Sequence, residues 1–438
     1  MLGYLLLFLA IVLYFVKEYR YFSIFLLIGF LSGLDGGYGL LTEQIIGVNT
    51  SKLAFFYLLF IGIYDWRCLF FNTIIPKKIR NASFAFILFI VCSCIVSYCY
   101  YGVSVYEIFS TAYPMSFVLF LFILTKLKDW EIKKIVVLLF YLTFLQAILF
   151  ICQSFTGVSL MPYRLVPAYY SEFHLYRFYN FPPFLLFFCC YSFMVTRQKI
   201  FRMPVLLVRF IFVIASLCTL GRTYIFVTLL LIFYSKVLKK RNINVFRTFF
   251  VAILLLLLLF PYLNDVIGAD TYGDMSAVLN GKFETYYGSA ENATMSYRFL
   301  WISERLDYML KKPISMLFGL GYIQEGSPLC TKLYNFMIGL RDENSGLVTQ
   351  LVTPDIAYGN FLTRFGLLGT FLYMYMLIQI FILFEKYKQY NDFYNVCFIV
   401  LTMSLVNSFS SSDISSVSYM MIFYLFSIYL LKTSYKYG

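Results

Sequence analysis

Long apolar runs, separated by short basic connections, follow one another along most of the chain. A membrane-crossing helix needs about 20 predominantly apolar residues, and runs near that length recur here. They predict thirteen transmembrane helices, at 2–16, 21–34, 53–71, 83–101, 113–125, 135–153, 181–196, 204–219, 223–235, 248–263, 357–384, 394–409 and 416–431. The run at 21–34 is short for a span, so the count lies between twelve and fourteen. We expect an all-α polytopic membrane protein.

One long polar segment, residues 264–355, interrupts this pattern. It has 92 residues and holds 11 of the chain's 22 acidic residues. Loops of this length in compact proteins are usually functional or disordered. The chain therefore divides into a bundle of about ten helices at 1–263, this loop, and a C-terminal set of helices at 356–438.

Part of the long loop has helical periodicity, at 296–310. Its expected apolar stripe consists of Phe299, Ile302, Leu306 and Met309. Ser296 is expected to cap the start of this helix, and Lys311, Lys312 and Pro313 to end it. A buried-looking run then leads to Gly319-Leu320-Gly321, a turn with bare backbone. This predicts a helix lying on the membrane face and feeding a tight glycine loop.

Composition narrows the possible functions. The chain is 61% hydrophobic and 13% charged, with a mean hydropathy of +0.79, far from soluble globular proteins. Little sequence remains for a soluble catalytic domain, which excludes a Rossmann or P-loop enzyme. His174 is the single histidine, so a multi-histidine metal site cannot form. We expect no cofactor and no metal.

The net charge of +13 reflects topology rather than nucleic-acid binding. If the N-terminus is outside, 21 Lys and Arg residues fall on the inner connections. The short outer loops then hold only Lys52, Arg164, Arg177 and Arg222. Because basic residues concentrate on the cytoplasmic side, the C-terminus is expected inside and the 264–355 loop outside.

Several short motifs follow one another in roughly the C-terminal three-fifths of the chain. They are Arg177, Asn180 and Pro182; Leu220-Gly221-Arg222-Thr223; Arg298 and Trp301; Pro313; Gly319-Leu320-Gly321; Pro354-Asp355-Ile356-Ala357-Tyr358-Gly359-Asn360-Phe361-Leu362; and Gly366-Leu367-Leu368-Gly369. In this order, and on one predicted side of the membrane, they resemble the signature of the O-antigen polymerase and ligase superfamily. Residues 1–150 match that superfamily only in hydropathy.

The resemblance implies an enzyme of the bacterial cytoplasmic membrane whose active site faces the periplasm or cell exterior. Its donor and acceptor would be undecaprenyl-diphosphate-linked glycans, polymerised into O-antigen, capsular or similar surface polysaccharide. Membrane lipids, a chain-length regulator and a flippase are the further partners implied. The superfamily's histidine falls on Asp355 here. Since the ligase branch relies on that histidine, the departure favours a polymerase.

Two alternatives remain open. A ligase would transfer finished glycan to another acceptor. A flippase or transporter for the same lipid-linked sugar would predict internal repeats and several charges within spans. No internal repeat is visible, and the charges within spans are Asp65, Arg67, Arg209 and Arg364.

Release of a lipid diphosphate needs positive charge at the outer surface. The chain has no Asp-x-Asp pair to hold a metal-bound diphosphate, so arginines, which bind phosphate oxygens bidentately, would replace the metal. Arg222 and Arg298 are the catalytic candidates. Each also has an ordinary explanation, since Arg222 could end a helix and Arg298 could lie on a solvated face.

Asp355 is the candidate base for the acceptor hydroxyl. It would alternatively complement a helix dipole, with Thr353 as the cap and Pro354 in the first helical position. Rival bases in the same loop are Glu291, Glu304, Asp307 and Glu325. The substrate-binding candidates are Arg164, Arg177, His174, Trp301, Arg305, Gly319, Gly321, Tyr358 and Asn360. Arg177 could instead bind lipid headgroups, and His174 could be a surface residue.

Overall fold

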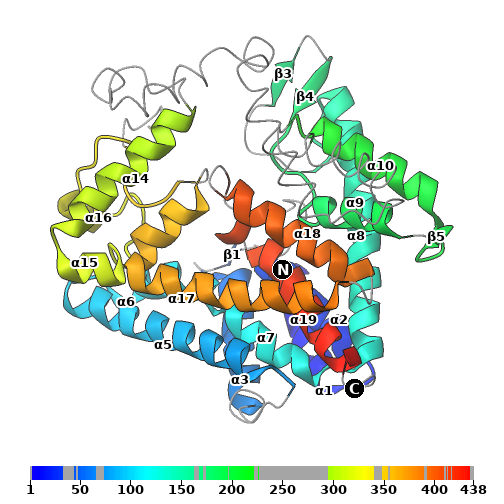
Figure 1. Ribbon diagram of the computed structural model, residues 1–438, viewed down its shortest axis with the longest axis horizontal. Coiled ribbons are helices and arrows are strands. Elements are labelled where there is room, and N and C mark those ends of the chain that lie inside the picture. The colour runs from blue at the N-terminus through cyan, green and yellow to red at the C-terminus, as the bar shows by residue number, and fades with distance from the viewer. Residues whose placement is uncertain are drawn as a thin grey trace.

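The structure is a computed structural model of the whole chain. It describes residues 2–32, 44–45, 48–65, 74–161, 167–170, 174–195, 197–220, 225, 294–339, 348–353, 356–388, 392–408, 411, 413–415 and 417–434. The described part is mostly helical (Figure 1). Three short antiparallel hairpins accompany the helices: β1 (Gln44–Ile45) with β2 (Val48–Asn49), β3 (Ala168–Tyr170) with β4 (Leu175–Arg177), and β5 (Lys199–Ile200) with β6 (Met203–Pro204).

The helices follow the apolar runs closely. The first half contains α1 (Leu2–Phe15), α2 (Arg20–Ser32), α3 (Thr50–Tyr64), α5 (Lys77–Cys99), α6 (Val105–Ala112), η1 (Tyr113–Leu119), α7 (Phe120–Ile123), η2 (Leu124–Lys126), α8 (Asp129–Thr156), α9 (Leu185–Met194) and α10 (Val205–Cys218). The second half contains α14 (Thr294–Leu310), α15 (Pro313–Phe318), α16 (Pro328–Leu333), α17 (Ala357–Tyr387), α18 (Asp392–Asn407), η6 (Asp413–Ser415) and α19 (Val417–Ser434).

Eleven of the thirteen predicted spans coincide with a helix or a continuous helical run. The other two, 223–235 and 248–263, lie outside the described residues apart from residue 225. By length and composition, 4 described helical segments could cross a membrane: Lys77–Cys99, Val105–Lys126, Asp129–Thr156 and Ala357–Tyr387. The remaining apolar helices have 10–17 residues, so the count of thirteen stays a prediction.

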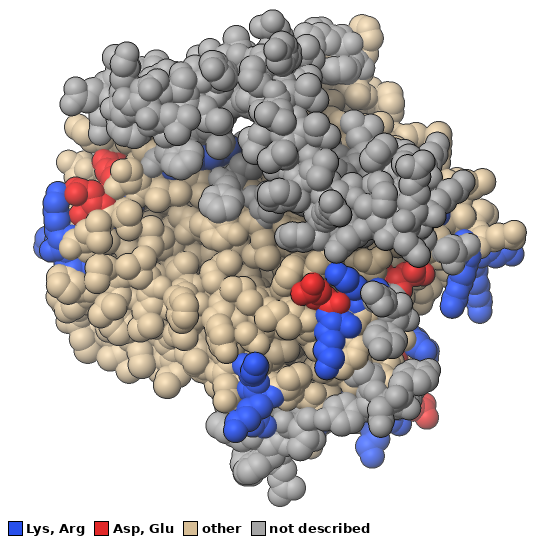
Figure 2. Space-filling view, in the orientation of Figure 1, with Lys and Arg blue, Asp and Glu red and all other residues tan. Residues whose placement is uncertain are grey.

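Apolar side chains cover the outside of several helices as well as the core. Phe8 of α1, Leu206 of α10 and Phe371 of α17 are 66%, 74% and 66% exposed. Figure 2 shows a broad surface without charged side chains on one face, with most of its Lys and Arg side chains toward the margins. Helices that are apolar both inward and outward are typical of a membrane protein.

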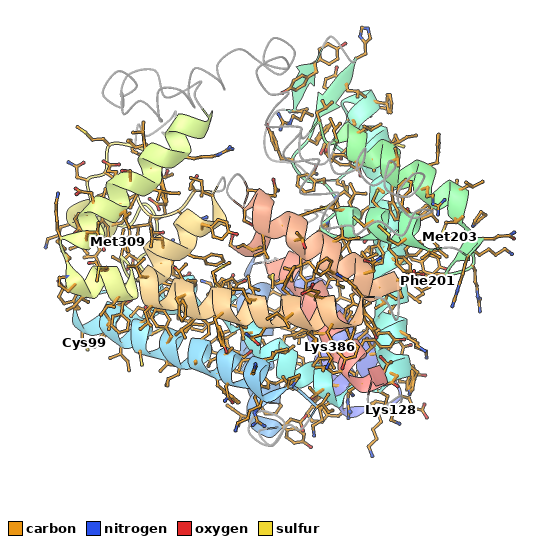
Figure 3. All side chains as sticks on the ribbon, viewed as in Figure 1. Cys99, Lys128, Phe201, Met203, Met309 and Lys386 are labelled. Carbon is orange, nitrogen blue, oxygen red and sulfur yellow. The ribbon has the colours of Figure 1, made fainter. Side chains whose placement is uncertain are left out.

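Tertiary contacts join helix ends that the sequence assigns to the same side. The hydroxyls of Tyr394 and Thr433, both expected at inner ends, lie 2.7 Å apart. Asp65, which the sequence placed within the span 53–71, directly follows α3 and forms an ion pair with Lys126 at 3.1 Å. In Figure 3, Lys128, Phe201, Met203 and Lys386 lie toward one end of the molecule, and Cys99 and Met309 toward the other. The first group was expected on the inner side and the second on the outer side.

Candidate functional site

The long loop is built around α14, which the sequence placed at 296–310. The helix ends at Leu310, as predicted, and Pro313 starts the separate helix α15. Its beginning was predicted wrongly, because α14 already starts at Thr294 and Ser296 lies within its first turn. A cap can sit only where the hydrogen-bonded turns begin, so Ser296 does not cap this helix.

The buried face of α14 also differs from the predicted stripe. Trp301, Arg305 and Met309 are completely buried, whereas Ile302 and Leu306 are half-buried. The sequence indicated Arg305 as a substrate-binding candidate and left it out of the apolar stripe. A buried arginine is tolerated when its donors are satisfied, and tertiary structure supplies the acceptors.

Arg305 joins α14 to the segment just before α17. Its Nε and Nη2 donate to the carbonyl oxygens of Gln350 and Thr349, each at 3.2 Å. Its Nη1 lies 2.8 Å from Glu304 Oε2. The guanidinium stacks between the rings of Trp301, at 4.3 Å, and Phe336, at 4.5 Å. A charge held in this way supports the loop and does not face an open site.

Two acidic rivals for the role of base bind backbone amides. Glu304 accepts from the N–H groups of Met337, at 2.7 Å, and Ile338, at 3.1 Å. Glu325 accepts from three successive N–H groups, those of residues 350–352, at 2.5, 2.8 and 3.2 Å. Hydrogen bonds from backbone amides fix each carboxylate in place. Both acids therefore shape the loop.

The other two rivals are placed differently. Asp307 forms an exposed ion pair with Lys311 at 2.5 Å, one turn along α14. Glu291 lies outside the described residues. Asp355 and Pro354 also lie outside them; the nearest described residues are Thr353 before them and Ile356 after them.

The segment around Asp355 is held by the side-chain amide of Asn360. Asn360 Oδ1 accepts from the Thr353 N–H at 2.8 Å, and its Nδ2 donates to the Thr353 carbonyl at 2.5 Å. Because Thr353 is bound in this way, α17 begins at Ala357 with Ile356 as its N-cap residue. The predicted cap at Thr353, with Pro354 in the first helical position, was wrong. The Ala357 N–H instead meets the carbonyl oxygens of Ser408, at 3.1 Å, and Ser411, at 2.9 Å.

The first turn of α17 packs directly on α14. A Cβ atom at Gly359 would lie 2.8 Å from the ring of Trp301, so only glycine permits this approach. Trp301, Leu300, Ile338 and Ile356 form one small buried cluster. The half-buried Tyr358 donates from its hydroxyl to the Leu405 carbonyl at 2.6 Å. The helix that carries Arg298 and Trp301 (the R-x-x-W helix, α14) and the start of α17 are thus a single packed unit.

The glycine loop packs against a break in α17. Gly366 has φ 62° and ψ −168°, which interrupts the helix. Cβ atoms at Gly366 and Gly319 would each lie 2.6 Å from backbone atoms of the facing segment. The N–H of Gly319 donates to Ser315 O at 2.8 Å and that of Leu320 to Thr363 O at 2.6 Å. At Gly319 and Leu320, the backbone N–H groups of the predicted glycine turn are therefore hydrogen-bonded to other backbone groups of the protein.

Tyr101, just after α5, fastens the same loop. Its hydroxyl donates to the Gly319 carbonyl at 2.7 Å and lies 2.7 Å from Ser315 Oγ. A phenol has one proton, so Ser315 donates in the second bond. Gly321 fits beneath its ring, which a Cβ there would meet at 3.0 Å.

Arg177 and His174 belong to a different element, the β3–β4 hairpin above the end of α8. Arg177 donates to the Tyr170 hydroxyl at 3.1 Å and lies 4.7 Å from the centre of the Tyr179 ring. His174 Nδ1 lies 3.1 Å from the Tyr169 hydroxyl, and His174 has a left-handed backbone, with φ 50°. The aromatic residues of this loop therefore orient its cation and its histidine.

The structure brings some predicted site residues together and leaves others apart. Arg298, Trp301, Arg305, Gly319, Gly321, Tyr358 and Asn360 belong to the unit formed by α14, α15 and the first half of α17. In Figure 1, α14 and the β3–β4 hairpin lie along the same edge of the molecule. Arg164 and Arg222 lie outside the described residues. Arg298 is half-buried on the Trp301 side of α14.

Sequence reasoning missed several residues that build this unit. Gln350 accepts from the Phe336 N–H at 2.6 Å through its side chain, and nothing in its sequence context marks it. Arg364 donates from Nη1 to the carbonyl oxygens of Gly321, at 3.2 Å, and Ile323, at 2.6 Å. Its position as a charge within a predicted span was the available signal.

A comparison with known proteins identified no relative: no protein-family model and no curated protein matches the chain significantly.

Proposed function

We propose that this protein is a membrane glycosyltransferase that polymerises undecaprenyl-diphosphate-linked oligosaccharide repeat units on the outer face of a bacterial cytoplasmic membrane. The proposal starts from the motif resemblance. The observation that carries it further is the packing of Trp301 of the R-x-x-W helix against Gly359, together with the binding of Thr353 by Asn360. These contacts bring two motifs into one unit and fix the chain on both sides of Asp355.

In the proposed reaction, a hydroxyl oxygen of the acceptor repeat attacks the anomeric carbon of the donor's reducing-end sugar. The bond from that carbon to the phosphate oxygen breaks, and undecaprenyl diphosphate leaves with the bonding electrons. The hydroxyl proton passes to the Asp355 carboxylate. Arg222 and Arg298 stabilise the charge that grows on the leaving diphosphate.

The roles of the other candidates follow from their surroundings. Glu304 and Glu325 are bound to backbone amides, so Asp355 is the acid we assign as the base. Arg305 and Asn360 act as positioning residues, because their polar groups bind the fold itself. Arg177 and His174, on the aromatic hairpin, are assigned to substrate binding together with Arg164.

A polymerase is favoured over a ligase because Asp355 replaces the histidine on which the ligase branch relies. The test is reconstitution of the purified protein with lipid-linked repeat units, followed by separation of the products by size. A ladder of products supports the polymerase. A single transfer to another acceptor would identify a ligase, and movement of the lipid without new glycosidic bonds would identify a flippase.

A further inference from the structure

A cavity of about 500 Å³ lies between α8, α9, α18 and α19, at the opposite end of the helices from the proposed active site. Its apolar wall includes Val136, Tyr191, Phe393 and Phe426, and its charged groups are Lys133, Arg197 and Asp392. This volume is typical of a small-molecule site. In the expected topology this end faces the cytoplasm.

The charges of the cavity favour an anion. Lys133 and Arg197 come from α8 and from the residues just after α9, and Asp392 opens α18. Two cations against one carboxylate leave a net positive charge. The Lys133 ammonium lies 5.9 Å from the centre of the Tyr429 ring. Among the described residues, no hydrogen bond or ion pair is found for the Arg197 guanidinium, and its side chain is exposed at the cavity mouth.

The aromatic wall consists of closely packed rings. The rings of Tyr191 and Phe393 stack with centroids 4.1 Å apart, and Phe393 stacks on Phe426 at 4.8 Å. Phe201, which also lines the cavity, has its ring centroid 5.0 Å from that of Phe140, in an edge-to-face pair. These rings together form an apolar surface on which an alkyl chain can lie.

A tight hairpin turn carries Phe201. Phe201 and Arg202 connect β5 to β6, and both have positive φ, 45° and 73°, as the favoured two-residue hairpin turn requires. Tyr141 donates to the Phe201 carbonyl oxygen, and the Phe201 ring packs in the aromatic wall. The hairpin therefore sets the position of an aromatic side chain at this cavity.

We propose that the cavity binds an anionic phospholipid of the inner leaflet. The phosphate would lie between Lys133 and Arg197 at the mouth, and one acyl chain would lie along the wall of Val136, Phe201 and Phe393. A phosphodiester accepts charge-assisted hydrogen bonds from both cations. Its tail matches the apolar lining, which a soluble phosphate would leave uncovered. This site is independent of the proposed glycosyl transfer.

The test is native mass spectrometry of the full-length protein in detergent, titrated with phosphatidylglycerol. Lys133→Gln or Arg197→Gln should each weaken binding by about tenfold, as expected for one lost charged contact. Lys199→Gln is the matched control, because it removes an exposed charge two residues from Arg197 that does not line the cavity. Val136→Phe should weaken binding by filling the cavity while every charge remains.

Three further results would overturn the proposal. Equal effects of Arg197→Gln and Lys199→Gln would indicate general electrostatic attraction. Phosphatidylcholine binding as tightly as phosphatidylglycerol would remove the requirement for an anion. Glycerol 3-phosphate binding as tightly as the lipid would identify a soluble phosphate as the ligand. Because Arg197 is exposed, its variant should fold, so the test does not depend on Val136→Phe being stable.

Discussion

Glu304 and Glu325 each use both carboxylate oxygens to bind the loop, whereas Arg305 uses its guanidinium to bind backbone carbonyls. At the scale of single residues, charge therefore has two uses in this region. Some charged groups already bind backbone groups of the loop. A substrate could bind only the charged groups that make no such bonds. This distinction decides which variants should affect turnover without unfolding the protein.

The first prediction concerns Asp355. If Asp355 accepts the acceptor's proton, Asp355→Asn should lower turnover by about 100-fold or more, because the amide has nearly the same size but no basicity. Asp355→His should retain partial activity, since neutral imidazole also accepts protons near pH 7. Turnover is measured from product ladders on matched amounts of folded protein.

Asp307→Asn is the control for this measurement, because Asp307 is exposed and paired with Lys311. It should leave turnover unchanged. Near-normal turnover in Asp355→Asn would instead mean that this acid only complements the helix dipole, at a cost of about 0.3–1 kcal/mol in stability. Glu291 and His174 would then be tested as the base.

The second prediction concerns the leaving diphosphate. Arg222→Lys should lower turnover by about tenfold or more, because lysine supplies charge without the bidentate fork. Wild-type activity should survive EDTA, since arginines are assigned the role that a metal would otherwise have. Loss of activity in EDTA with rescue by magnesium would contradict the arginine assignment.

At the scale of elements, the outer loop and α17 meet through two glycines. Gly319 and Gly366 have φ of 81° and 62°, and a Cβ atom at either position would lie 2.6 Å from backbone atoms of the other segment. The bend at Gly366 directs the first turns of α17 toward α14. This joint therefore links the membrane helix to the proposed site.

The third prediction tests that joint. Gly366→Ala should lower the free energy of unfolding by about 2–5 kcal/mol, which combines backbone strain at positive φ with overpacking against backbone atoms. Gly326→Ala also places alanine at a positive φ, +75°, but its Cβ would meet nothing within 4 Å. It should cost only about 1–2 kcal/mol. Equal losses in the two variants, measured by thermal unfolding in detergent, would mean that the close packing does not contribute.

At the scale of the whole molecule, several helix ends that the basic residues assign to one side contact each other. Ends expected inside meet through Tyr394 and Thr433. Ends expected outside contact each other through Tyr101 with Gly319. Consistent grouping of this kind is what alternating spans require, but it does not say which end faces the cytoplasm.

The fourth prediction concerns which helix ends face the cytoplasm. In a variant from which the native cysteines are removed, a membrane-impermeant thiol reagent should label Lys311→Cys in intact cells. It should label Arg202→Cys, and a cysteine at position 240, only after the membrane is opened, because the basic connections are expected inside. Both Lys311 and Arg202 are exposed, so access is comparable. Inverted labelling would place the proposed site on the wrong side for its donor.

The sequence by itself determined the mostly helical architecture, most described helix positions and the end of α14 at Leu310, because apolar length and helix-ending residues act locally. It did not predict the three short hairpins in the described part of the chain, whose strands are only two or three residues long. It did not determine the start of α17, where the Asn360 amide binds Thr353 seven residues away. Nor did it predict the burial of Arg305, whose acceptors at Thr349 and Gln350 lie 44 and 45 residues along the chain. Only the tertiary structure decided which charged side chains bind the backbone of the loop, because their partners come from segments far away in the sequence, which local patterns do not contain.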